Sequence, residues 1–189
     1  MMIKRSYWLG LLLLSGCVSQ PMMQQKVTVP NKIEFEQQYY QLSKTDDLGS
    51  VVKYTYELIN KDQQKHLEIF QDLQQNFVKT DAKYQQRIQL RERMFRNTGV
   101  DVYNNKLEQG KLYSYVVYPP DEQFIDYQVD VAKGENLAKC GFVQFQYTQQ
   151  FAPIKSSQTA ILKNLQQQVA EPMVQKLAKF AFPWSCDER

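Results

Sequence analysis

The sequence of 189 residues contains little of what most enzyme active sites are built from. It has one histidine, His66, and seven glycines that are nowhere clustered. A single histidine cannot form the ligand clusters that zinc requires, and a catalytic triad also needs a histidine beside its nucleophile. The G-x-S-x-G and H-E-x-x-H motifs and a glycine-rich phosphate loop are all missing. The sequence therefore favours no catalytic class, no metal and no cofactor, and we expect His66 to be a surface or capping residue of a helix.

Long apolar runs are also missing. The apolar stretch from about Tyr7 to Leu14 is far shorter than the roughly 20 residues that a membrane-spanning helix requires. It follows the positive charges of Lys4 and Arg5 and ends in small residues before Cys17. A positive start, a short apolar run and small residues at the cut site are typical of a bacterial export signal. A transmembrane anchor and an ordinary secretory signal are the alternatives.

The run Leu14-Ser15-Gly16-Cys17 resembles the lipobox of bacterial lipoproteins. The resemblance covers residues 1–17 only. It implies that residues 1–16 are removed and that Cys17 carries a diacylglyceryl thioether and an acylated amine, which together form a stable membrane anchor. Val18 stands where an aspartate favours retention in the inner membrane of enterobacteria. The resemblance therefore implies a lipid-anchored envelope protein, in the outer membrane and facing the periplasm.

Charge and composition say little about partners beyond the membrane. Without Lys4 and Arg5 the mature chain has 21 basic and 20 acidic residues, which indicates no polyanionic partner and no nucleic acid. We expect a flexible tether over residues 17–30 and a single domain over residues 31–189. The 26 glutamines are spread over periodic segments, and we expect them to be neutral surface residues.

Cys140 and Cys186 are the cysteines that remain once Cys17 is lipidated. Exported proteins fold in an oxidising compartment, so we expect these two residues to form a disulfide. The bond would tie the C-terminal segment back to the domain. Two separate buried thiols are the alternative.

Hydrophobic periodicity predicts an α+β domain. Alternation of period two predicts strands over 52–58, 100–107, 112–118, 124–132 and 139–149, with a turn over 133–136. A helical period from 62 to 97 predicts one long amphipathic helix, with a break near 78–81 as an alternative. A C-terminal helix begins near Ser156 and is interrupted at Pro172. The expected fold is a mostly antiparallel sheet of about five strands packed against a long helix and a C-terminal helix.

Two groups of charged residues are candidates for function. Arg87, Arg91 and Arg96 form a basic stretch on the predicted long helix, which could bind a protein partner or solvate a helix flank. Paired carboxylates, the catalytic groups of many sugar hydrolases, are the other group; the candidates are Asp46 with Asp47, Asp121 with Glu122, and Asp126 with Asp130. We expect a non-catalytic envelope lipoprotein that holds a protein partner. The alternative is a cell-wall or lipid ligand-binding protein or hydrolase.

Overall fold

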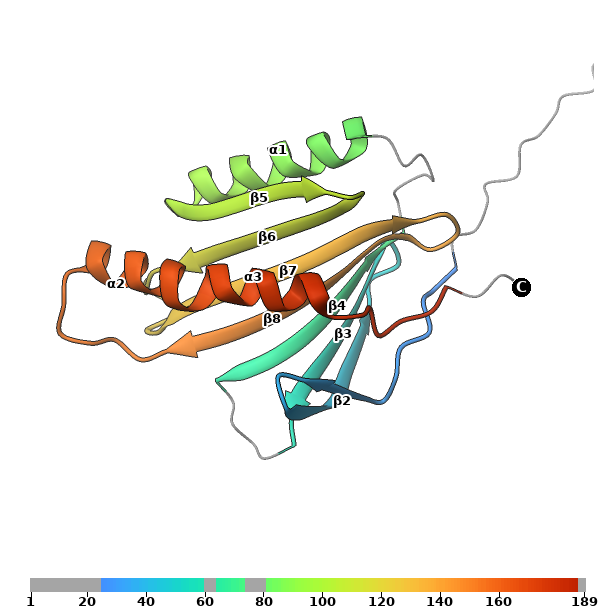
Figure 1. The fold of residues 1–189 in the computed structure, drawn as a ribbon, viewed down its shortest axis with the longest axis horizontal. Coiled ribbons are helices and arrows are strands. Elements are labelled where there is room, and N and C mark those ends of the chain that lie inside the picture. The colour runs from blue at the N-terminus through green and yellow to red at the C-terminus, as the bar shows by residue number, and fades with distance from the viewer. Residues whose placement is uncertain (1–24, 60–63, 74–80, 187–189) are drawn as a thin grey trace, which may run out of the picture.

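The computed structural model describes residues 25–59, 64–73 and 81–186. In these ranges the chain forms one eight-stranded antiparallel sheet in the order β1-β2-β3-β4-β8-β7-β6-β5 (Figure 1). Two meanders of four strands meet where β4 pairs with β8. The strands are β1 (Lys32–Phe35), β2 (Gln38–Asp47), β3 (Val51–Leu58), β4 (Lys65–Asp72), β5 (Val102–Glu108), β6 (Lys111–Tyr118), β7 (Tyr127–Leu137) and β8 (Gly141–Phe151).

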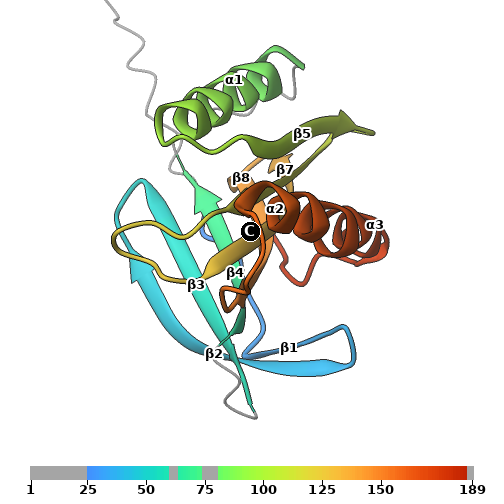
Figure 2. The ribbon, with the colours of Figure 1, turned by 90° about the vertical axis from the view of Figure 1, so that its left-hand side faces the viewer.

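The helices lie on opposite faces of this sheet (Figure 2). In the sequence, helix α1 (Asp81–Asn97) follows β4, which lies in the middle of the sheet, and precedes β5, which lies at its edge. A connection of this kind must cross β8, β7 and β6. The C-terminal helical segment consists of α2 (Gln158–Leu165), the π-helical turn Gln166–Ala170 and α3 (Glu171–Lys179). Pro172 in the first turn of α3 has no N–H to donate, which explains why the helix is irregular there.

Most of the apolar core lies beneath the C-terminal helical segment. Val129, Val131 and Phe145 of the sheet pack in the same cluster as Leu165 and Leu177. Beneath α1 there are two smaller clusters, one around Tyr84, Ile88, Leu112 and Phe142 and one around Phe95, Val100 and Val116. The face of the sheet below α1 is therefore only partly apolar, and polar side chains occupy the rest.

The predicted fold was wrong in two respects. The sheet has eight strands in the described ranges instead of about five, and the long helix predicted over 62–97 does not exist. Its first part contains strand β4, and the helix α1 begins at Asp81. In β4 three consecutive residues, Leu67, Glu68 and Ile69, are buried, because central strands have neighbours on both faces. This burial removes the period-two alternation that identifies a strand in sequence.

Two further boundaries also differ from the predicted ones. Strand β2 is absent from the predicted strands, because most of its side chains are exposed and give no apolar alternation. Strand β7 continues to Leu137 through the turn predicted over 133–136. His66 lies in β4 and does not belong to a helix. Along the described ranges, no helix combines the length and apolar character needed to cross a membrane.

The first and last described residues are joined to the sheet near the β7–β8 hairpin, which we call the proximal end (Figure 1). Gln25 N donates to Lys139 O at 2.9 Å, and Cys140 forms a disulfide with Cys186. The fully buried amide of Gln71 donates to Gln25 O at 2.6 Å and to Cys140 O at 2.8 Å. Residues 25–30, which the sequence assigned to the tether, therefore belong to the folded domain. Cys17 and the rest of the expected tether lie outside the described residues.

Candidate functional site

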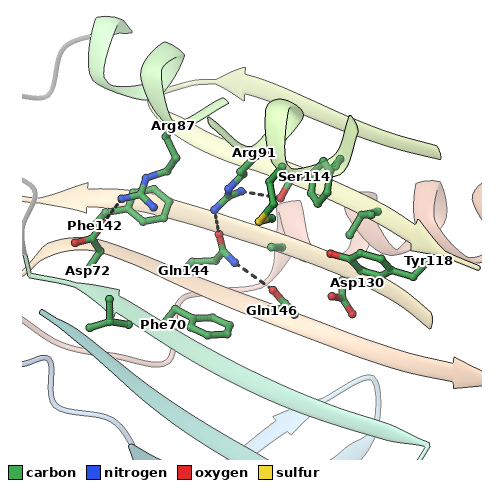
Figure 3. A pocket seen from close by; sticks show the side chains of 15 residues that line it. Phe70, Asp72, Arg87, Arg91, Ser114, Tyr118, Asp130, Phe142, Gln144 and Gln146 are labelled. Atoms are coloured by element: carbon green, nitrogen blue, oxygen red, sulfur yellow. Dashed lines mark hydrogen bonds and ion pairs between the residues drawn. The ribbon is translucent and has the colours of Figure 1, made fainter. Parts of the chain in front are cut away.

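A cleft of about 280 Å³ lies between α1 and the polar part of the sheet face below it (Figure 3). Its walls come from α1 on one side and from β4, β8, β7 and β6 on the other. On α1, the apolar residues Tyr84, Ile88 and Phe95 anchor the helix, and Arg87 and Arg91 share the same side because they follow at helical spacing. The polar lining consists of Asp72, Arg87, Arg91, Ser114, Tyr118, Asp130, Gln144 and Gln146.

Arg87 closes the proximal part of the cleft. Its Nη2 atom lies 2.6 Å from Asp72 Oδ2, and its guanidinium stacks 3.9 Å from the ring centroid of Phe142. The ion pair neutralises Arg87, and the aromatic ring fixes its orientation. Arg87 therefore has a structural partner for its charge.

Arg91 has no such partner. Its Nη1 donates to Ser114 Oγ at 3.0 Å and its Nη2 donates to Gln144 Oε1, which are both neutral acceptors. Within the described residues, no carboxylate lies within ion-pair distance of Arg91. Burial and the neighbouring charge of Arg87 lower the pKa of Arg91 to about 10, so it stays positive at neutral pH. A desolvated cation without a counter-charge costs free energy, which a bound anion would recover.

A chain of hydrogen bonds connects Arg91 to a carboxylate farther along the cleft. Figure 3 shows its first bonds, from Arg91 through Gln144 to Gln146. Gln144 Nε2 donates to Gln146 Oε1 at 3.2 Å, Gln146 Nε2 donates to Thr148 Oγ1 at 3.3 Å, and Thr148 Oγ1 donates to Asp130 Oδ1 at 2.9 Å. These three side chains alternate along β8 and therefore share one face. Every bond in the chain donates in the direction from Arg91 to Asp130, so the two charges polarise it consistently.

Asp130 is the second uncompensated charge. Thr148 and Gln128 each donate to its Oδ1 atom at 2.9 Å. Among the described residues, no Lys, Arg or His lies within ion-pair distance of it. Burial raises the pKa of Asp130 to about 6, against the lowering effect of its two hydrogen bonds, and the charge of Glu68 raises it further. Tyr118 also lines the cleft, and burial and the charge of Asp130 raise its pKa.

Comparison with known proteins shows that the part of the chain that forms the cleft has relatives. A protein-family model matches residues 27–182, which contain all of the cleft residues. The chain belongs to that family. It is 33% identical over 163 residues to an uncharacterized protein of Haemophilus influenzae (strain ATCC 51907 / DSM 11121 / KW20 / Rd), a match that covers 80% of each chain. No solved structure matches the chain. Cys17 and Cys186 lie outside the range matched by the family model.

The three arginines predicted from the sequence do not lie on one surface. Arg87 and Arg91 face the sheet and line the cleft. Arg96 is exposed and has only Glu92, 3.9 Å away on the same helix, as an ion-pair partner in the described ranges. A role for Arg87, Arg91 and Arg96 in partner binding stays a prediction, and Arg96 is the one that faces outward.

The candidate carboxylate pairs are not brought together in the cleft. Asp46 and Asp47 end strand β2, and Asp121 accepts two backbone N–H bonds in the turn before β7. Of these candidates, Asp130 lines the cleft, and Asp72 is the other lining carboxylate. Their partners on β8, Phe142 and Thr148, are six residues apart, or about 20 Å at 3.3 Å per residue. Paired-carboxylate hydrolysis uses separations of about 5–9.5 Å.

Sequence reasoning missed the polar residues of the sheet. Gln71 and Gln144 are buried, although glutamines were expected at the surface. A strand over 139–149 puts Gln144 and Gln146 on one face, but nothing in the sequence shows that α1 covers that face. His66, 4.0 Å from Glu68 and half-buried, lies outside the cleft lining. In ranges 25–59, 64–73 and 81–186, no three His, Cys, Asp or Glu side chains gather closely enough to hold a metal.

Proposed function

We propose that the protein is a lipid-anchored, non-catalytic interaction module of the bacterial envelope that holds a protein partner. The observation that carries this proposal is the position of the exposed apolar side chains. Most of them lie at the end of the sheet opposite to the β7–β8 hairpin, which we call the distal end: Tyr39, Ile59, Phe124, Ile125 and Ile154. Ile125 and Ile154 flank the paired ends of β7 and β8, whereas Tyr39 and Ile59 lie several strands away. Exposed apolar side chains that are close together at one end of a domain are typical of an interaction site.

The turn between β6 and β7 presents two of these side chains. Phe124 is 63% exposed and Ile125 is 77% exposed. The turn is held by Asp121, whose Oδ1 accepts from Gln123 N at 2.7 Å and from Phe124 N at 2.8 Å. The apolar side chains are therefore held outward by an ordered backbone, which lowers the entropy cost of binding.

Anchoring would orient this turn away from the membrane. Gln25, the first described residue, is bonded to the proximal end of the sheet. The turn precedes Tyr127 at the other end of β7, whose 11 residues span about 36 Å at roughly 3.3 Å each. A lipid on Cys17 would thus hold the proximal end near the outer membrane and direct Phe124 and Ile125 into the periplasm. The exposed Arg96 of α1 lies at the same distal end as this turn.

The disulfide and the sequence motif support the same location. Cys140 and Cys186 are bonded, with Cα atoms 6.1 Å apart, as suits a domain that folds outside the reducing cytoplasm. The lipobox resemblance at Cys17 supplies the anchor. The cleft offers no nucleophile and base in hydrogen-bond contact among its described lining residues, which favours binding over catalysis.

Cross-linking in intact envelopes tests the proposal. The native chain should capture one protein at close to a one-to-one ratio, and the double variant Phe124→Ser/Ile125→Ser should capture at least tenfold less. Leu48→Ser is the matched control, because Leu48 is 73% exposed but lies in the turn at the proximal end. Equal loss of capture in the control, or undiminished capture by the double variant, would contradict a distal interface.

Detergent partitioning and mass spectrometry of the same chain test the anchor. The native chain should partition into the detergent phase, and mass spectrometry should show a mature N-terminus at Cys17 that carries the diacylglyceryl group. A mature N-terminus without lipid, or a native chain in the aqueous phase, would contradict lipid anchoring.

A further inference from the structure

The cleft between α1 and the sheet has a pair of opposite charges that the protein does not neutralise. Arg91 bonds only to neutral acceptors, and Asp130 accepts only from Thr148 and Gln128, in the described part of the chain. Such groups are costly to bury alone. Since both line the same open cleft, a ligand can compensate both at once.

The spacing of the two charges limits the ligand. Ser114, which accepts from Arg91, pairs with Ala132, and Asp130 lies two residues from Ala132 on the same strand. The backbones of Ser114 and Asp130 are therefore about 7–8 Å apart. Gln144, the other acceptor of Arg91, lies four residues from Thr148, the partner of Asp130 on β8, or about 13 Å along the strand at roughly 3.3 Å per residue. Because the guanidinium of Arg91 bonds to both Ser114 and Gln144, its span to Asp130 accommodates two charge-assisted hydrogen bonds of about 2.8 Å each and a small ligand that carries both charges.

The shape of the site fits a small ligand. Ala132 lines the floor between the two charges, and its small side chain leaves room above β7. The cleft volume of about 280 Å³ falls just below the roughly 300–1,000 Å³ of sites for drug-sized ligands. The exposed Met94 lies at its edge and adds an apolar contact.

We propose that this cleft binds a small zwitterionic ligand, an amino acid, with its carboxylate on Arg91 and its ammonium on Asp130. The two hydrogen bonds to Asp130 both end on Oδ1, so Oδ2 is the acceptor for the ammonium. Gln144 and Ser114 hold the guanidinium in place, and the hydrogen-bonded chain along β8 holds the carboxylate. The site differs from the distal protein interface proposed above and does not depend on it.

Calorimetric titration of the detergent-solubilised full chain tests the site. The probes are free L- and D-amino acids, with acetate and methylamine as the two single-charge fragments. At least one amino acid should bind, and each fragment should bind at least tenfold more weakly. A second probe is a cell-wall peptide that contains a diamino acid with a free amino group and a free carboxylate. If the peptide binds more tightly than every free amino acid, the wall is the source of the ligand; if a free amino acid binds more tightly, the ligand is the free form. Either result supports the site.

Variants decide which residues carry the binding. Arg91→Met and Asp130→Asn should each weaken amino-acid binding at least tenfold. The matched controls are Arg96→Met on the same helix and Asp126→Asn just before β7, and both should bind as the native chain does. Absence of binding by every amino acid and by the peptide would overturn the proposal. So would acetate binding as tight as amino-acid binding, or equal effects of the site and control variants.

Discussion

At the scale of single residues, the cleft contains charges that do not contribute to folding stability. Asp130 has a pKa raised to about 6, first by burial and then by the charge of Glu68, so its charged form is disfavoured in the folded protein. Arg91 is positive without a carboxylate partner in the described ranges. Groups kept at a cost to stability are typical of binding sites, where a ligand supplies the missing interaction.

Replacing Asp130 should therefore stabilise the protein at neutral pH. The folded protein holds the Asp130 proton more tightly than the unfolded chain, so the native stability falls as the pH rises from about 4 through about 6, by about 3 kcal/mol at most. Asp130→Asn lacks this titration. The free energy of unfolding of Asp130→Asn should exceed that of the native chain by more at about pH 8 than at about pH 4.5, as measured by urea unfolding. Parallel pH profiles of the two proteins would contradict the assignment.

Gly134 allows Phe142 to lie flat beneath Arg87. A Cβ atom at position 134 would overlap the ring of Phe142 on the neighbouring strand. Gly134→Ala should thus lower the free energy of unfolding by about 1–3 kcal/mol, the usual cost of overpacking. In the double variant Gly134→Ala/Phe142→Leu the cost of the alanine should largely disappear, as urea unfolding of the four proteins of the cycle would show. An equal alanine cost in both backgrounds would contradict the overlap.

At the scale of elements, the crossing of α1 over the sheet creates the cleft. The helix begins near the proximal end and leads to β5 at the sheet edge, so one side of it must face β8, β7 and β6. That side combines apolar residues with Arg87 and Arg91. The apolar residues hold the helix in place, and the arginines meet the polar residues of the strands below.

The C-terminal segment is the element that depends most on covalent bonding. Thr28 and Ser185 exchange backbone hydrogen bonds of 2.9 and 3.0 Å, and Cys186 is bonded to Cys140 next to them. With a sequence separation of 46 residues, the chain-entropy relation gives a stabilisation of about 4 kcal/mol.

Reduction should remove that stabilisation. We expect dithiothreitol to lower the free energy of unfolding of the native chain by up to about 4 kcal/mol. The variant Cys140→Ser/Cys186→Ser should already have the lower value and should not respond to the reductant. An unchanged unfolding curve of the native chain after complete reduction would contradict a stabilising role.

At the scale of the whole molecule, the two ends of the sheet differ. The proximal end gathers the first described residues, the disulfide and the buried amide of Gln71. The distal end presents Phe124, Ile125 and Ile154 to solvent. This asymmetry suits a protein that is held at one end and binds at the other, with the α1 cleft as a separate site between them.

The sequence by itself determined the features that depend on local pattern. The clean alternation of Val52, Tyr54, Tyr56 and Leu58 predicts a strand, and β3 covers these residues. The helical spacing of Tyr84, Ile88 and Phe95 predicts a helix there, and α1 contains all three. The export signal expected from the lipobox resemblance at Cys17 is also a local pattern, since such signals are short linear segments, and it stays a prediction.

Only the tertiary structure decided the extent of the sheet and the location of the cleft. Whether Leu67 to Ile69 form a strand depends on the pairing of β4 with β8, because residues buried on both faces have no diagnostic period. Whether Arg91 and Gln144 face solvent or each other depends on the path of α1 across strands that are distant in sequence. Local spacing specifies which side chains share a face, whereas burial and uncompensated charge arise only when two such faces meet.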